Sequence, residues 1–118
     1  MNYVLIIASN WLTRSLIGAQ LKEEGFEVIA SATFAEAVSQ LAQLQIIPGL
    51  LIIETLELDI DQKAIDWLSK ICPRACLIII RGAWDYPSQL RWSGSTCDLK
   101  KPLTIGQIVD KVKDILAD

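Results

Sequence analysis

The stretch GLLIIET, residues 49–55, places four aliphatic side chains in a row and then a carboxylate, Glu54. A short apolar run without alternation predicts a strand that is buried on both faces of a sheet. Such strands belong to parallel sheets covered by helices on both sides, and binding sites form at the carboxyl ends of their strands. Glu54 is therefore predicted to leave the sheet at the edge where a site would lie.

Five runs with strand character, this one included, lie along the chain, and segments with helical spacing separate them. The runs are YVLIIA (3–8), EVIASA (27–32), GLLIIE (49–54), ACLIII (75–80) and, more weakly, STCDLK (95–100). Regular alternation of strands and helices predicts right-handed crossovers and a doubly wound parallel α/β sheet. Residues 1–118 form a single predicted domain, because the length is that of one ordinary domain.

The predicted helices have recognisable ends. Helix-period segments start at about Trp11, Thr33, Asp61 and Thr104, and a short further helix is predicted within GAWDYPSQLRWSG (82–94). The first helix is predicted to bury Leu12, Leu16 and Ala19 and to end at Gly25, which suits the left-handed position after a helix. This pattern predicts five strands and five helices.

Composition and charge argue against several classes of function. Of the 118 residues 52% are hydrophobic, yet no run approaches the ~18 apolar residues of a membrane span. A net charge of −3 argues against a nucleic-acid partner, which needs clustered lysine and arginine. With no histidine and three cysteines, the chain is not expected to hold zinc or to use a histidine-activated nucleophile. The odd cysteine count and the lack of a basic leader predict a reducing, cytoplasmic location.

Polar residues follow four of the predicted strands. They are Ala8-Ser9-Asn10 after the first, Glu54 after the third, Arg81 after the fourth and Lys100-Lys101 after the fifth. In a doubly wound sheet these positions share one edge, so they could line a common polar crevice. The other interpretation, which the pattern leaves open, is that strand ends are polar simply because they reach the surface.

Two segments resemble motifs of response-regulator receiver domains. PGLLIIETLELD (48–59) resembles the acceptor strand of that family, which an aspartate closes, and GSTCDLKKPL (94–103) resembles its fifth strand, which ends in Lys-Pro. The resemblance covers essentially the whole chain. It implies a flavodoxin-like (βα)5 three-layer sandwich with parallel strand order 2-1-3-4-5, and a role in two-component or phosphorelay signal transduction.

The chain departs from the family at the positions that carry phosphoryl chemistry. The acidic pair that holds Mg²⁺ is matched by Ala8 and Ser9, neither of which can neutralise a dication. Glu54 stands at the phosphoacceptor position, and the lysine is retained as Lys101. Because phosphoryl transfer without a metal loses its main electrostatic stabiliser, we expect no phosphorylation, no bound metal or cofactor, and no enzymatic activity.

The switch positions of the family also differ. Arg81 matches the switch serine or threonine that ends the fourth strand, and Asp98 matches its aromatic partner. Glu54 is predicted to pair with Lys101, with Arg81 or with both, because the third and fourth strands are neighbours in the implied order. Arg81 could also be shared with Asp98. The interpretation left open is a solvated charge cluster without a mechanical role.

A concentration of aromatic residues suggests an interaction surface. Trp84, Tyr86 and Trp92 fall within nine residues, and tryptophan and tyrosine are enriched at interface hot spots. In receivers the face formed by the fourth helix, fifth strand and fifth helix is the usual output and dimerisation surface, so this resemblance implies the same face here. Alternatively, two of the three aromatics fill the core beneath a short helix.

Three hypotheses about function follow. The favoured one is a pseudo-receiver that is not phosphorylated and acts through constitutive contact with an unknown protein partner or with itself. The second is a flavodoxin-like domain that binds an anionic ligand such as flavin phosphate, although the loop SNWLTRS (9–15) lacks the glycine that phosphate sites usually need. The third is a working phosphorelay receiver with an unconventional acceptor.

Overall fold

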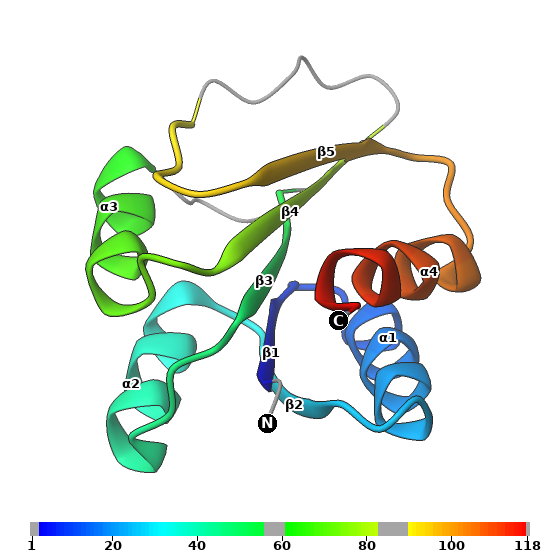
Figure 1. Cartoon of the computed structure of the whole chain (residues 1–118), viewed down its shortest axis with the longest axis horizontal. Helices are drawn as coiled ribbons and strands as arrows, with labels where there is room; N and C mark the ends of the chain where they lie inside the picture. Colours follow the sequence, from blue (N-terminus) through cyan, green and yellow to red (C-terminus); the bar gives the residue numbers. More distant parts are fainter. Residues whose placement is uncertain (1–2, 56–60, 83–89, 118) are drawn as a thin grey trace.

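Five parallel strands form the sheet, in the order β2-β1-β3-β4-β5 (Figure 1). The computed structural model describes residues 3–55, 61–82 and 90–117. The strands are β1 (Tyr3–Ile7), β2 (Glu27–Ser31), β3 (Leu50–Glu54), β4 (Cys76–Arg81) and β5 (Thr96–Lys100). The predicted doubly wound sheet and its strand order are confirmed.

The helices make the two outer layers. They are α1 (Trp11–Glu23), α2 (Phe34–Leu44), α3 (Gln62–Ile71) and α4 (Ile105–Leu116). α1 and α4 lie side by side on one face of the sheet, and α2 and α3 cover the other (Figure 1). The helix predicted between the fourth and fifth strands falls mainly on residues 83–89, outside the described residues, so α4 is the predicted fifth helix. None of the described helices is long and apolar enough to cross a membrane.

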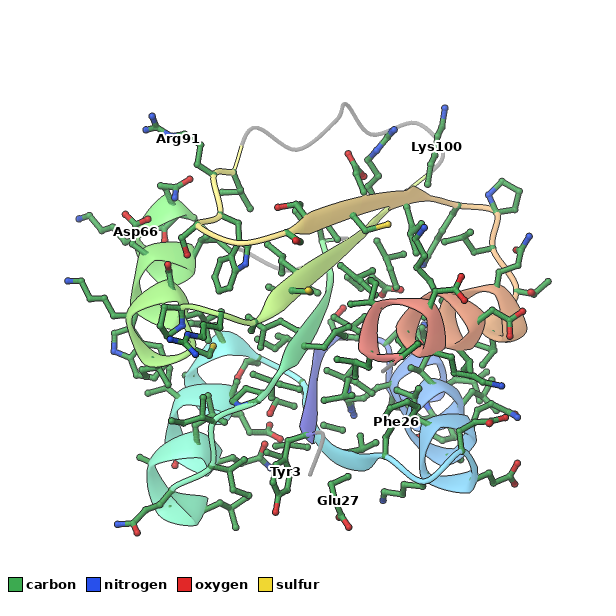
Figure 2. The ribbon with its side chains drawn as sticks, viewed as in Figure 1. Tyr3, Phe26, Glu27, Asp66, Arg91 and Lys100 are labelled. Carbon is green, nitrogen blue, oxygen red and sulfur yellow. The ribbon has the colours of Figure 1, made fainter. Side chains whose placement is uncertain are left out.

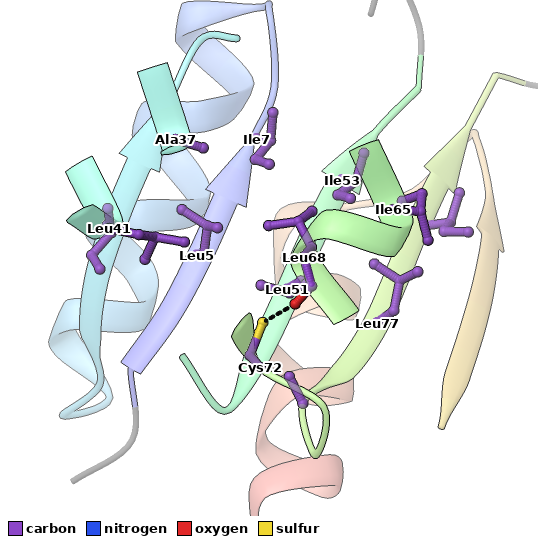
Figure 3. Close-up of a cluster of buried hydrophobic side chains, with 13 residues drawn as sticks. Leu5, Ile7, Ala37, Leu41, Leu51, Ile53, Ile65, Leu68, Cys72 and Leu77 are labelled. Carbon is purple, nitrogen blue, oxygen red and sulfur yellow. Dashed lines mark hydrogen bonds between the residues drawn. The ribbon is translucent and has the colours of Figure 1, made fainter. Parts of the chain in front are cut away.

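Two apolar clusters flank the sheet, and successive side chains of each central strand alternate between them. In β1, Leu5 and Ile7 join the cluster under α2 and α3, shown in Figure 3, whereas Val4 and Ile6 join the cluster under α1 and α4. β3 is buried along its whole length, as its unbroken aliphatic run predicts. β5 is an edge strand, and its residues alternate between exposed and half-buried.

Side-chain caps fix where the helices begin. Asn10, Thr33, Asp61 and Thr104 each accept a hydrogen bond from the backbone amide three residues ahead. At Thr104 the cap is reciprocal, because the side chain of the third helical residue accepts a bond from the Thr104 amide. Gly25 has a φ of +93°, so it terminates α1 in the left-handed conformation expected of it.

The prediction about the buried face of α1 is wrong. Leu12 and Leu16 are 52% and 47% exposed and Ala19 is also exposed, whereas Ile17 and Gly18 face the sheet, together with Leu21 one turn on. The helix carries two apolar stripes, so apolar spacing alone cannot say which of them is buried. The stripe that faces the sheet holds Ile17, Gly18 and Leu21, and an ideal Cβ on Gly18 would lie 3.7 Å from the nearest side-chain atom of β2, an ordinary contact.

Candidate functional site

Strand register brings the predicted site residues to one edge of the sheet. Ile7 of β1 pairs with Ile53 of β3, and Glu54 pairs with Ile80 of β4. The segments that follow these strands therefore leave the sheet side by side, together with the end of β5. The topology thus places Ala8, Glu54 and Arg81 on neighbouring strand ends, as the sequence predicts.

Glu54 is a buried carboxylate paired with Lys101. Its side chain is 2% exposed, and the Lys101 Nζ lies 2.8 Å from Oε2. The contact is an ion pair rather than an aligned hydrogen bond, because Oε2 has no hydrogen-bond partner among the described residues. Lys100 is exposed and points away from the sheet (Figure 2), so Lys101 is the lysine that turns back to Glu54. The expected pairing of Glu54 with Lys101 is confirmed.

Arg81 and Asp98 form a second ion pair between β4 and β5. The Arg81 Nε donates to the Asp98 Oδ1 at 2.9 Å, and the two side chains are 17% and 33% exposed. Asp98 lies opposite Ile79 in the register, so it is on the same face of the sheet as Arg81, two residues further along β4. The two residues at the switch-equivalent positions are therefore bound to each other, which is one of the pairings that the sequence predicts.

The positions of the metal-binding pair carry no carboxylate, and an arginine lies beside them. Ala8 is 1% exposed and its side chain has no ligand atom. The Arg14 Nη1 reaches back from α1 to the carbonyl oxygens of Ala8, at 2.6 Å, and Ser9, at 3.3 Å. In the part of the chain that the structure describes, no group of three metal-ligating side chains occurs. Mg²⁺ does not fit these residues, since it prefers carboxylate oxygens and a cation already stands here.

Sequence reasoning missed Arg14, although a signal was present. Arg14 is the only charged residue from Trp11 through Leu21, and it lies three and seven residues before the buried Ile17 and Leu21. A lone cation on the buried stripe of a helix usually has a partner, because an unpaired buried charge is costly. The apolar spacing of the helix assigns the other stripe of α1 to the core and gives Arg14 no role.

The predicted aromatic surface is described only in part. Trp84 and Tyr86 lie outside the described residues. Trp92 is half-buried and packs against the cluster under α2 and α3, and its Nε1 donates to the Ala75 carbonyl oxygen at 2.8 Å. For Trp92 the core alternative therefore describes its position better than the interface alternative.

Cys72 is structural. It is 1% exposed, and its thiol donates to the Leu68 carbonyl oxygen at 3.0 Å (Figure 3). Burial raises the pKa of the Cys72 thiol to about 11, so the nucleophilic thiolate is scarce at neutral pH. This thiol is therefore not a candidate for covalent chemistry.

Comparisons with known proteins support the fold. No family model matches the chain, and no curated protein matches its sequence. Among solved structures, it is similar to a CheY-like receiver domain protein from Methanospirillum hungatei, with a TM-score of 0.78 and 19% identity over 98% of this chain and 94% of that one. A two-component response regulator from Clostridium difficile has a TM-score of 0.78 and 20% identity, over 98% and 96%. A response regulator from Thermotoga maritima has a TM-score of 0.76 and 16% identity, over 100% and 99%.

These structural neighbours are response-regulator receiver domains, so the flavodoxin-like fold implied by the resemblance is confirmed. Identities of 16–20% establish a shared fold and nothing finer. The function of the chain depends on its own site residues.

Proposed function

We propose that this chain is a receiver-like module of two-component or phosphorelay signalling that takes no phosphoryl group. It works in the cytoplasm through constitutive protein–protein contacts. The observation that carries the proposal is the ion pair between Glu54 and Lys101, 2.8 Å apart. The acceptor position holds a buried carboxylate that is already paired with a lysine. We infer that this carboxylate serves as a fixed negative charge and does not attack a phosphoryl donor.

The charges around Glu54 support this proposal. A phosphoryl group in transfer needs its developing charge neutralised, and in this fold family a divalent metal supplies most of that. Here Ala8 and Ser9 replace the acidic pair, and Arg14 brings its guanidinium to their carbonyls instead. Arg14 has a fixed position in α1 and no exchangeable water shell, so it cannot arrange an incoming phosphoryl donor as Mg²⁺ would.

The second ion pair supports a module without a phosphorylation switch. In the family the switch depends on a hydroxyl and an aromatic side chain that can rearrange together. In this chain the two positions hold Arg81 and Asp98, joined at 2.9 Å. A charge-assisted hydrogen bond between neighbouring strands favours one arrangement, so the same surface is available at all times.

The partner surface is proposed to include β5 and α4 together with Trp84 and Tyr86. Trp92 is left out, because it packs against the core and its indole N–H is bonded to Ala75. The partner is a protein rather than a nucleic acid, since the chain carries a net charge of −3.

A flavin-phosphate site is disfavoured by the first-strand loop. The Asn10 side chain accepts the Thr13 amide at 3.0 Å, so it already caps the amino-terminal turn of α1, where a phosphate would bind. A visible absorbance spectrum of the purified protein without a flavin band is the expected result. A bound flavin would overturn the proposal in favour of this alternative.

The decisive experiment is incubation with acetyl phosphate and Mg²⁺, followed by measurement of the intact mass. We expect no added phosphoryl group, both on the wild type and on Glu54→Asp, because the aspartate restores an acceptor without restoring the metal ligands. A mass gain on the wild type that hydroxylamine removes would show a working receiver with an unconventional acceptor and would overturn the proposal.

A further inference from the structure

Two thiols share a surface pocket at the amino-terminal ends of β4 and β5. Cys76 is the first residue of β4 and Cys97 lies near the start of β5, and both are free thiols on half-buried residues. Both line a pocket of about 240 Å³, which Lys111 of α4 lines as well. Glu54 lies at the opposite, carboxyl-terminal ends of the strands, so this pocket is separate from the site around Glu54.

Strand register puts the two thiols on the same face of the sheet. Cys97 lies opposite Ile78. Cys76 precedes Ile78 by two residues in β4, so its side chain leaves the sheet on the same face, since side chains alternate along a strand. Both cysteines accordingly pack against the apolar cluster under α1 and α4. Cys72 belongs to the cluster on the other face, and its thiol is bonded to the Leu68 carbonyl oxygen.

We propose that Cys76 and Cys97 bind one soft monovalent metal ion, Cu(I), between their sulfurs as a two-coordinate dithiolate. Thiolate sulfur selects Cu(I) over hard cations. Two ligands suit this ion, which accepts linear coordination, whereas structural Zn²⁺ sites take four. No group of three metal-ligating side chains occurs within residues 3–55, 61–82 and 90–117, so the pair stands there without a third such ligand. The inference is independent of the proposed function, and it departs from the expectation of no bound metal, which concerned magnesium and zinc.

The separation of the two backbones suits a bridging ion better than a disulfide. Neighbouring strands lie about 4.8 Å apart and rise about 3.3 Å per residue, so the register places the Cα atoms of Cys76 and Cys97 about 8 Å apart. A disulfide needs Cα atoms within about 7 Å, because it joins the two sulfurs at about 2 Å. Two metal–sulfur bonds of about 2.3 Å each let the sulfurs stay about 4.6 Å apart. A bridging ion therefore spans a gap that is too wide for an unstrained disulfide.

The charges of the pocket balance around such an ion. Both thiols lose a proton to solvent on binding, and two thiolates with one monovalent cation make a complex with one negative charge. The half-buried Lys111 lines the same pocket and supplies one positive charge. An unpaired charge in a partly buried position is costly, so the complex and the Lys111 ammonium group stabilise each other.

Titration with Cu(I), in competition with a chromophoric Cu(I) chelator under anaerobic reducing conditions, tests the two ligands. We expect one copper ion per chain for the wild type. Cys76→Ser and Cys97→Ser should each bind it about 100-fold or more weakly, because loss of a residue that only orients a ligand already costs about 10–100-fold. Cys72→Ala is the matched control and should bind as the wild type does, since Cys72 lies on the other face of the sheet. A wild type that binds no copper, or full affinity in either serine variant, would overturn the proposal.

The same titration tests the balancing charge. Lys111→Gln should weaken copper binding by about tenfold, the effect of a residue that acts through the ligands. Lys113→Gln is the control, because Lys113 lies on the same helix but pairs with Glu24 at 3.3 Å. Equal effects of the two substitutions would overturn the role given to Lys111.

Alkylation of the wild type measures the site without any variant. Bound Cu(I) should protect Cys76 and Cys97 together from iodoacetamide and leave the reaction of the buried Cys72 unchanged. Peptide mapping by mass spectrometry follows the three thiols separately. Zn²⁺ at the same concentration should protect neither thiol of the pocket, because two side chains do not complete its coordination. Protection of one thiol alone, or equal protection by Zn²⁺, would overturn the two-coordinate site.

Discussion

The Glu54 carboxylate is buried at the end of β3, and the Lys101 ammonium group balances its charge. An ion pair at ~4 Å is worth roughly 4 kcal/mol at an effective dielectric constant near 20, but desolvation of the two groups offsets much of that gain. The pair as a whole therefore adds little stability. Loss of one partner is expensive all the same, because the other charge stays where water cannot reach it fully.

Glu54→Gln is accordingly expected to lower the free energy of unfolding by about 1–3 kcal/mol, since Lys101 would lose its counter-charge. Urea denaturation of Glu54→Gln, Lys101→Met and the double variant measures the coupling between the two residues. Glu24 and Lys113 provide a matched surface pair, at 3.3 Å with side chains 36% and 48% exposed. Their coupling should stay below about 1 kcal/mol. A Glu54–Lys101 coupling no larger than that would mean that the buried pair is effectively solvated.

The sequence could predict that these residues meet, but not how they pair. Glu54 and Arg81 end β3 and β4, Lys101 follows β5, and the topology of one parallel sheet brings such residues to the same side. Which cation faces Glu54 depends on the pleat of the strands and on the conformation of the loop after β5. Neither can be predicted from the order of apolar and polar residues. Asp98 binds Arg81 because the register places both on one face of the sheet.

At the scale of elements, strands were easier to predict than the orientation of a helix. Strand boundaries follow from unbroken apolar runs, since few other structures can bury both faces of a backbone segment. α1 has two apolar stripes, and only the folded structure shows that the one with Ile17, Gly18 and Leu21 faces the sheet. That choice depends on the distance between layers, which the sequence of the helix does not contain.

Two glycines associated with α1 should respond oppositely to alanine. A Cβ on Gly18 would meet its nearest neighbour at 3.7 Å, an ordinary contact, so Gly18→Ala should stabilise the protein by about 0.5–1 kcal/mol through helix propensity. Gly25 has a φ of +93°, which an alanine adopts only with strain, so Gly25→Ala should destabilise it by about 1 kcal/mol or more. Thermal and urea unfolding compare the two. Destabilisation by Gly18→Ala would mean that the space between α1 and β2 does not hold a methyl group.

At the scale of the whole molecule, the fold was more predictable than the chemistry. A fixed alternation of strands and helices restricts the topology strongly, because crossovers are right-handed and both faces must be covered. The same scaffold hosts many activities, so a shared fold does not decide whether the site works. In this chain the strand-end residues Ala8, Ser9 and Glu54 set the charge at the carboxyl ends of β1 and β3, and the sheet is formed all the same.

Because Ala8 and Ser9 stand at the positions of the metal-binding pair while the fold is kept, the response of the protein to Mg²⁺ can be predicted. Millimolar Mg²⁺ should leave the melting temperature of the wild type unchanged, since a ligand that does not bind the native state cannot stabilise it. The double variant Ser9→Asp with Glu54→Asp places two carboxylates at the adjoining ends of β1 and β3, where Ile7 and Ile53 are in register. Two carboxylates can hold a hydrated Mg²⁺, so its melting temperature should rise with the ion.

Differential scanning calorimetry with Mg²⁺, and with equal ionic strength from NaCl, measures both responses. Glu54→Asp alone is the matched control and should behave as the wild type does, because one carboxylate supplies too few protein oxygen ligands for the ion. If the wild type gained as much stability from Mg²⁺ as the double variant, the ion would bind elsewhere. The charge at these strand ends would then give no support to the proposal that the chain takes no phosphoryl group.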